Sequence, residues 1–111
     1  MNVQKLTQKS IEAVQLAQRT AEENVNQQLL QEHLLFALVT QQEGLIPELL
    51  QKMGVDVSTL KTRLESMISA LPKVSSTSGS DIYMSGDLNA ALTAAEGEAA
   101  KMKDEYVSVE H

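Results

Sequence analysis

One stretch near the middle of the chain, residues 31–40 (QEHLLFALVT), constrains the fold more than any other. It contains an unbroken apolar run at positions 34–39. A surface helix carries an apolar stripe, so a helix that is apolar all round should be buried on most sides. A short apolar run can also be a buried strand. Here Leu, Ala and Gln dominate and the flanking segments have helical patterns, so the run predicts the central helix of an all-α domain.

Apolar spacing and capping residues predict the other helices. We expect five, at about 7–22, 31–41, 46–53, 56–71 and 85–102, with boundaries good to about two to four residues and no strand pairing. Thr7 and Asp56 suit N-caps, Gly54 suits the position after a helix end, and Pro72 ends the fourth helix. Gly97 lies inside the fifth helix at a cost of about 1 kcal/mol relative to Ala.

Composition narrows the class of protein. A chain of 111 residues supports one core, and with 3% aromatic residues that core must be filled by Leu, Ala, Val and Met. A net charge of −6 argues against nucleic acid or an anionic membrane as the main partner. The chain has no cysteine, no apolar segment approaching 18 residues and no signal-like N-terminus. We therefore expect a soluble cytoplasmic protein.

The chain also repeats itself. A shift of 78 positions aligns its two ends without a gap, cap on cap and core on core, and places Glu32-His33 on Glu110-His111. Two long repeats predict a pseudo-twofold domain rather than a solenoid. We assign residues 1–71 to the first repeat, 72–84 to a Ser-rich connector and 85–111 to a partial second repeat. Ser108 is expected to cap a sixth helix whose body is absent.

Several separated motifs resemble those of the Clp N-terminal domain, the substrate-binding module in front of the ATPase rings of Clp unfoldases. They are Leu6-Thr7, Glu32-His33-Leu34-Leu35, Leu49-Leu50, Gly54-Val55-Asp56, Leu71-Pro72-Lys73-Val74 and the segment from Asp104 to His111. The resemblance covers the whole chain and looks closest to the ClpB disaggregases. One departure is that the family's second repeat continues past Glu-His with an apolar helix, so we expect the chain to be truncated or processed there.

The resemblance implies a non-catalytic module that engages unfolded or aggregated proteins, with ATP chemistry in the rings of a hexameric stress-response parent. The alternative within the family is an adaptor-docking N-domain of the ClpC or ClpA type. The resemblance also implies that Thr7, Asp104 and Glu110 lie near one another at a groove between the repeats. Leu88, Leu92 and Val109 are candidates for the apolar floor of that groove. Each of these residues also has a simpler interpretation. Thr7 can be a plain N-cap, Asp104 a solvated turn residue and Glu110 a first-turn carboxylate. The apolar candidates can be ordinary core residues.

The sequence offers little for a small helical enzyme, the competing class. It contains no G-x-x-x-x-G-K-[ST] motif to hold a nucleotide phosphate, so no cofactor is expected in this piece. Glu32 and His33 are adjacent and do not share a helix face, and no motif supplies a third ligand, so no metal site is expected. The simpler interpretation of His33 is a half-buried side chain at the start of the core helix. A catalytic triad is not expected either.

Without the family's following helix, the fifth helix should leave apolar surface uncovered. At roughly 25 cal/mol per Å² of apolar area, a missing partner face of a few hundred Å² costs several kcal/mol. Such a chain is expected to dimerise, to exchange its C-terminal helix with a neighbour, or to fray after Pro72.

Overall fold

The computed structural model describes residues 3–74 and 82–111. In chain order the elements are η1 (Val3–Lys5), α1 (Gln8–Glu23), β1 (Gln28–Leu29), α2 (Gln31–Thr40), α3 (Leu45–Lys52), α4 (Val57–Ser69), β2 (Tyr83–Met84) and α5 (Gly86–Lys101). The five expected helices are present within two residues of their predicted ends, so the all-α prediction is confirmed. Residues 75–81 of the predicted connector lie outside the described part of the chain.

Local capping explains where the helices begin and end. The Thr7 hydroxyl accepts from the Ser10 N–H at 3.3 Å, Asp56 accepts from the Thr59 N–H at 3.3 Å, and Ser85 accepts from the Leu88 N–H at 3.1 Å. Gly54 follows the C-cap of α3 with φ +84°, a conformation that glycine adopts without a steric penalty. These bonds satisfy backbone groups that a helix leaves open at its ends.

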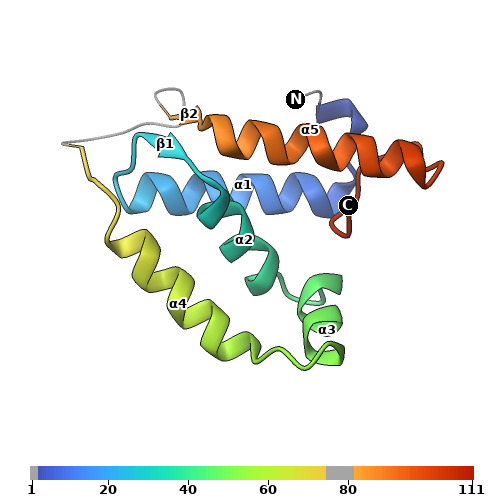
Figure 1. The fold of residues 1–111 in the computed structure, drawn as a ribbon. Coiled ribbons are helices and arrows are strands. Elements are labelled where there is room, and N and C mark those ends of the chain that lie inside the picture. Colours follow the sequence, from blue (N-terminus) through green and yellow to red (C-terminus); the bar gives the residue numbers. More distant parts are fainter. Residues whose placement is uncertain (1–2, 75–81) are drawn as a thin grey trace.

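The centre of the molecule is the contact between α1 and α2 (Figure 1). Ala13, Ala17 and Ala21 follow one another at helical spacing on α1 and are at most 1% exposed. Because alanine is small, this stripe lets α2 approach closely. α2 in turn contacts α3, α4 and α5, which makes it the hub of the fold.

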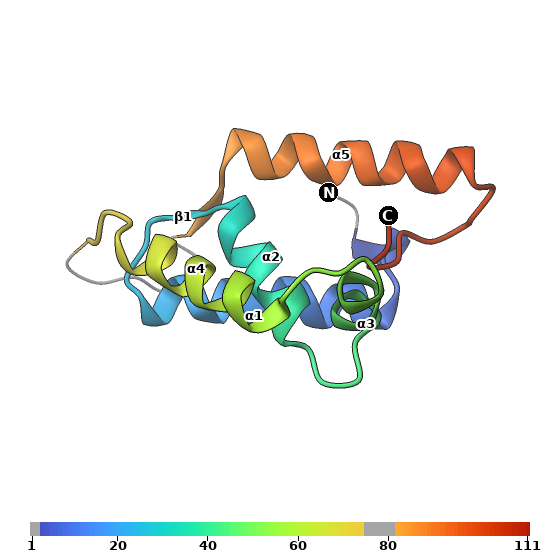
Figure 2. The same cartoon turned by 60° about the horizontal axis from the view of Figure 1, so that its bottom comes forward.

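Two details of the central helix differ from the prediction. Its buried residues are His33, Ala37 and Val39, whereas Leu35 is 38% exposed and Leu34 is only partly buried. The helix is therefore covered on fewer sides than its apolar run implies, because α5 crosses it near one end only (Figure 2). His33 is fully buried at 0% exposure, not half-buried.

A hydrogen-bonded cluster explains how a histidine can be buried there. The Leu30 N–H donates to His33 Nδ1 at 3.0 Å, and His33 Nε2 donates to Asn26 Oδ1 at 2.9 Å. The Asn26 amide donates to the Pro72 carbonyl at 3.1 Å, and the Asn24 amide donates to the Ile68 carbonyl at 2.7 Å. The cluster thereby ties the start of α2 to the end of α4.

The expectation of no strand pairing is wrong in two places. β1 and β2 form a two-residue parallel pair, Gln28 with Tyr83 and Leu29 with Met84, and an isolated parallel bridge joins Leu6 to Val107. Segments this short show no alternating pattern in the sequence, so periodicity could not reveal them. The β1–β2 pair holds the start of α2 beside the start of α5, and the Leu6–Val107 bridge holds the two ends of the chain together.

These contacts follow the internal repeat. The Ser85 N–H donates to the Leu29 carbonyl at 2.9 Å, and 78 positions away the Thr7 N–H donates to the Val107 carbonyl at 3.0 Å. The turns after α1 and α5 also correspond: Val25 has φ 56° and Lys103 has φ 60°. α1 and α5 run in opposite directions (Figure 1), as the two halves of a pseudo-twofold should.

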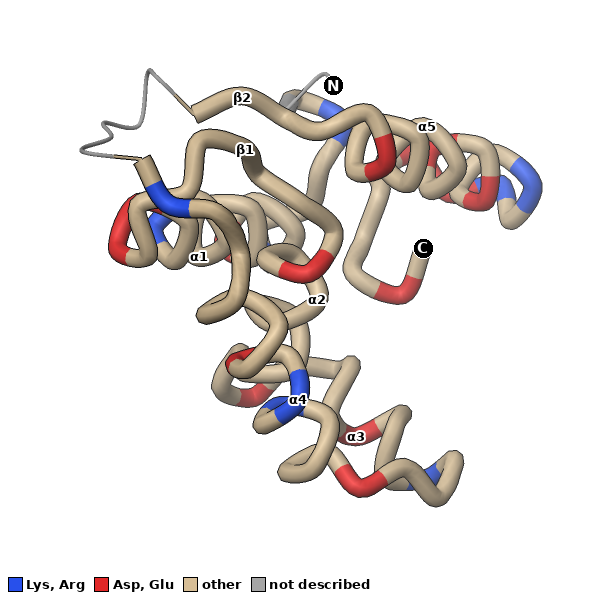
Figure 3. The backbone as a smooth tube through the Cα atoms, turned by 60° about the vertical axis from the view of Figure 1, so that its left-hand side comes forward, with Lys and Arg blue, Asp and Glu red and all other residues tan. Residues whose placement is uncertain are grey.

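Charged positions are spread along several of the helices (Figure 3). α4 carries Lys61, Arg63 and Glu65, and the last part of α5 carries Glu96, Glu98 and Lys101, so both signs of charge occur on each helix. The C-terminal turn carries an acidic residue, Glu110, at the point where the chain returns toward α1.

A candidate binding groove between the repeats

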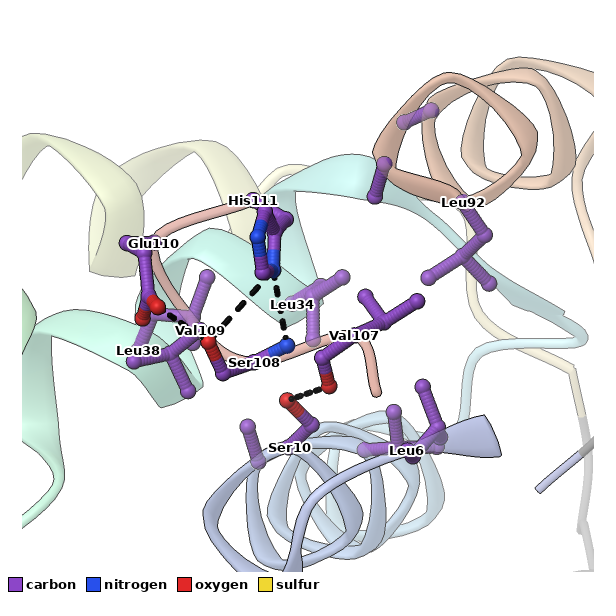
Figure 4. Close-up of a pocket in the computed structure, with 14 residues that line it drawn as sticks. Leu6, Ser10, Leu34, Leu38, Leu92, Val107, Ser108, Val109, Glu110 and His111 are labelled. Atoms are coloured by element: carbon purple, nitrogen blue, oxygen red, sulfur yellow. Dashed lines mark hydrogen bonds between the residues drawn. The ribbon is translucent and has the colours of Figure 1, made fainter. Parts of the chain in front are cut away.

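An apolar cavity of about 310 Å³ lies between α1 and α5, and we call it the inter-repeat groove (Figure 4). α2 contributes Leu34 and Leu38 to it, and the segment after α5 closes one side. The groove is lined by Leu6, Ser10, Ala13, Val14, Leu34, Leu38, Ala91, Leu92, Ala95, Val107, Ser108, Val109, Glu110 and His111.

The wall formed by residues 107–111 is fixed to the start of the chain by backbone bonds. The Val107 N–H donates to the Lys5 carbonyl at 2.7 Å, and the Val107 carbonyl accepts from the Thr7 N–H at 3.0 Å. The same carbonyl accepts from the Ser10 hydroxyl at 2.9 Å (Figure 4). The two segments of this contact come from different repeats, so the wall forms only when the chain is folded.

A histidine cap holds the turn at the end of that wall. The Ser108 N–H donates to His111 Nδ1 at 2.9 Å (Figure 4), and His111 Nε2 lies 2.8 Å from Asp104 Oδ2. The His111 side chain is 1% exposed, whereas that of Asp104 is 45% exposed. The ring is therefore sandwiched between a backbone donor and a carboxylate that solvent reaches.

Glu110 supplies the charge at the rim. It is exposed, and its carboxylate accepts from the Ser108 hydroxyl. This hydrogen bond holds the pKa of the Glu110 carboxyl below its ordinary value, in spite of partial desolvation. Glu110 is thus an ionised acceptor at neutral pH.

The structure separates the six predicted site residues. Leu92, Val109 and Glu110 line the groove. Thr7 lies outside it and turns its hydroxyl to Ser10 as the cap of α1. Asp104 borders a different depression with Lys5 and Glu96. Leu88 is buried at 1% exposure and faces the core and a second apolar depression beside α4.

Sequence reasoning missed several lining residues. The apolar run predicts core positions for Leu34 and Leu38, and their spacing of four places them on one helix face. Ala91 and Ala95 lie one turn apart on α5 and flank Leu92. The signal that could have found them is the small size of these alanines beside a leucine stripe, which leaves room between packed helices. For His111 the available signal is the internal repeat, which aligns it with His33.

The described part of the chain offers neither a metal site nor a membrane-spanning helix. Within residues 3–74 and 82–111, no three His, Asp or Glu side chains converge to hold a metal ion. Among the helices that the structure describes, none is long and apolar enough to cross a membrane.

The fold and the groove together define a class of protein: a small helical domain of two repeats that presents an apolar cleft with an acidic rim. Comparison with known families agrees, since the model of the Clp repeat (R) N-terminal domain matches residues 5–111. The chain belongs to the Clp repeat N-terminal domain family. The predicted resemblance is thereby confirmed.

Comparison with individual proteins shows which members of the family this chain resembles. Over its whole length the chain is 38% identical to the chaperone protein ClpB of Bacillus anthracis, 41% to that of Nitratidesulfovibrio vulgaris and 40% to that of Porphyromonas gingivalis. It spans only 12–13% of the length of these relatives. The chain is therefore a ClpB-like chaperone N-domain.

Solved structures support the fold. The Hsp104 N-terminal domain from Candida albicans matches with a TM-score of 0.79 and 21% identity, covering 94% of this chain and 67% of that one. The N-terminal domain of the ClpV1 ATPase from E. coli EAEC matches with a TM-score of 0.84 and 22% identity, covering 95% of this chain and 63% of that one.

Proposed function

We propose that this domain binds unfolded or aggregated polypeptide in the inter-repeat groove, as the substrate-binding N-terminal module of a ClpB-like, ATP-dependent disaggregase. The observation that supports this best is the chemistry of the groove. Leu, Val and Ala form its walls, and its charge is confined to Glu110 at the rim. A surface that accepts many sequences has to rely on apolar contact and a few backbone-directed hydrogen bonds.

The candidate residues divide into two roles under this proposal. Leu92 and Val109 touch the apolar side chains of the bound polypeptide, and Glu110 accepts hydrogen bonds from its N–H groups or basic side chains. Thr7, Leu88 and Asp104 hold the walls from behind. With a net charge of −6, the domain should favour apolar segments that also carry Lys or Arg.

The remaining parts of the proposal concern the parent protein. ATP binding and hydrolysis belong to its AAA+ rings, this domain itself has no ATPase activity, the parent assembles as a hexamer, and it works in the cytoplasm. Docking of a dedicated adaptor, as in a ClpC or ClpA type, is the alternative. Co-purification of one adaptor at a fixed ratio would favour that alternative.

The test fills the groove without changing its polarity. Ala95 lines the groove, whereas its neighbour Ala94 is exposed and outside it. Ala95→Leu should weaken binding of a fluorescently labelled, permanently unfolded polypeptide by about tenfold, because the added side chain occupies the cleft. Ala94→Leu is the matched control, since both changes keep a good helix former, and it should bind like wild type.

The measurement is a fluorescence-anisotropy titration without nucleotide, with the fold of each variant checked by circular dichroism. If wild type fails to bind, the proposed function is wrong. If both variants bind the polypeptide as tightly as wild type does, the groove is not the binding site. If Ala94→Leu weakens binding as much as Ala95→Leu, the bound surface lies on the outer face of α5.

A further inference from the structure

We infer that Asp104 is a positioning residue: it fixes the ring of His111, which in turn caps the turn that forms one wall of the inter-repeat groove. This inference rests on the proposed function and deepens it. It assigns Asp104 an indirect role in place of direct contact with bound polypeptide.

The hydrogen bonds set the tautomer of His111. Nδ1 accepts from the Ser108 N–H at 2.9 Å, so in the neutral ring the proton resides on Nε2. Nε2 lies 2.8 Å from Asp104 Oδ2, and an ionised carboxylate can only accept. Asp104 therefore favours the one tautomer in which Nδ1 is free to cap Ser108.

The location of the two side chains supports an indirect role. His111 lines the groove, and its side chain is 1% exposed. Asp104 lies behind it, where its own N–H donates to the Ala99 carbonyl at 2.9 Å and anchors it at the end of α5. Polypeptide in the groove would meet the wall that His111 supports, whereas Asp104 is not among the residues that line the groove.

The first repeat contains an equivalent capping histidine, whose ring is held by an amide oxygen in place of a carboxylate. Shifted by 78 positions, His33 corresponds to His111 and Asn26 to Asp104. The Leu30 N–H donates to His33 Nδ1 at 3.0 Å, and His33 Nε2 donates to Asn26 Oδ1 at 2.9 Å. A neutral amide oxygen therefore serves this purpose, so hydrogen-bond acceptance rather than negative charge is what the ring requires.

Losing the acceptor has a defined consequence. Without it the Nε2 tautomer loses its advantage, and the ring can rotate or move its proton to Nδ1. A protonated Nδ1 cannot accept from Ser108, so the turn at 108–110 loses its cap. Val109 and Glu110 lie in that turn and line the groove, which connects Asp104 to binding.

The experiment compares Asp104→Asn with Asp104→Ala. Asparagine keeps an acceptor oxygen and copies the first repeat, so Asp104→Asn should bind the labelled unfolded polypeptide within about twofold of wild type. Asp104→Ala should bind about fivefold to tenfold more weakly, on the order of one lost ordinary hydrogen bond. His111→Ala should weaken binding similarly, and adding Asp104→Ala to it should cause no further loss.

A second readout needs no polypeptide. Imidazole ¹⁵N shifts should report the Nε2–H tautomer for His111 in wild type and in Asp104→Asn, and a mixture in Asp104→Ala, with His33 as the reference ring in each spectrum. The Ser108 amide should exchange faster with solvent only in Asp104→Ala.

The outcomes distinguish the two proposals. If Asp104→Asn binds as weakly as Asp104→Ala while wild type binds well, Asp104 acts through its charge and the positioning role is wrong. If the His111 tautomer does not change in Asp104→Ala, the role is also wrong. If wild type does not bind, the proposed function fails, and the tautomer and exchange data alone decide whether Asp104 positions the His111 ring.

Discussion

At the scale of single residues, the buried His33 is held on both sides of its ring. It has 0% exposure, and both ring nitrogens are committed, one to the Leu30 N–H and one to Asn26. A proton added to Nδ1 would point at the Leu30 N–H, which is also a donor. The charged ring would in addition be buried without water to solvate it. Burial accordingly lowers the pKa of His33 from its ordinary 6.5.

This shift predicts how stability depends on pH. Because the pKa of His33 is lower in the folded than in the unfolded chain, the unfolded chain binds the extra proton first. The free energy of unfolding should be highest above about pH 6.5 and fall as pH drops through the folded pKa below it. Urea unfolding followed by circular dichroism between about pH 7.5 and pH 5.5 measures the slope. His33→Gln removes the titrating group, and a slope as steep as that of wild type would contradict this assignment.

At the scale of elements, capping residues set the boundaries of a helix, and helix propensity affects the stability of its interior. Gly54 illustrates the first effect and Gly97 the second. Gly97 lies inside α5, is exposed, and an added Cβ there would meet nothing within 4 Å. Gly54 has the same open space but a φ of +84°. An added Cβ therefore has equal room at the two positions, and only the backbone conformation of the two glycines differs.

The two glycines should respond in opposite directions to alanine. Gly97→Ala should raise the free energy of unfolding by about 0.5–1 kcal/mol, because alanine loses less backbone entropy in a helix. Gly54→Ala should lower it by about 1 kcal/mol, because alanine is strained at positive φ. Urea denaturation of both variants beside wild type is the measurement. A loss of stability in Gly97→Ala would show that α5 needs flexibility at that point.

At the scale of the whole molecule, the two repeats are unequally packed. α1 is in contact with α2 along its alanine stripe, whereas α5 contacts α2 near its own start (Figure 2). Beyond Leu92, the buried residue of α5 is Ala99. A second apolar depression of about 530 Å³ runs along α2 and α4 beside Leu88, and it includes the exposed Leu35 and Met67.

Uneven packing predicts uneven protection. Amides in the second half of α5 should exchange with solvent markedly faster than those between Ala13 and Ala21, because local opening there exposes less apolar surface. Hydrogen exchange at low protein concentration is the measurement. Raising the concentration should slow exchange in α5 if two copies cover each other's apolar surface, and sedimentation would then show dimers. Equal protection of α1 and α5 in a monomer would contradict both expectations.

Local signals in the sequence determined the helices of this protein. Thr7, Asp56 and Ser85 each cap a helix through a bond spanning three residues, and Gly54 ends one through its own backbone. Such short-range interactions leave a pattern that can be recognised along the chain. The 78-residue repeat and the family motifs added the pseudo-twofold arrangement.

The tertiary structure alone decided what the helices enclose. The pairing of Leu29 with Met84 and of Leu6 with Val107 joins residues far apart in the chain, so it leaves no periodic trace. The groove is the space that α1, α2 and α5 leave between them, and Leu34 faces it although its run predicts core. Asp104 and His111 were both visible in the sequence, but their bond depends on how the turn after α5 folds back toward α1. Local chemistry specifies which residues form a helix, whereas a cleft between helices is set by the packing of all of them at once.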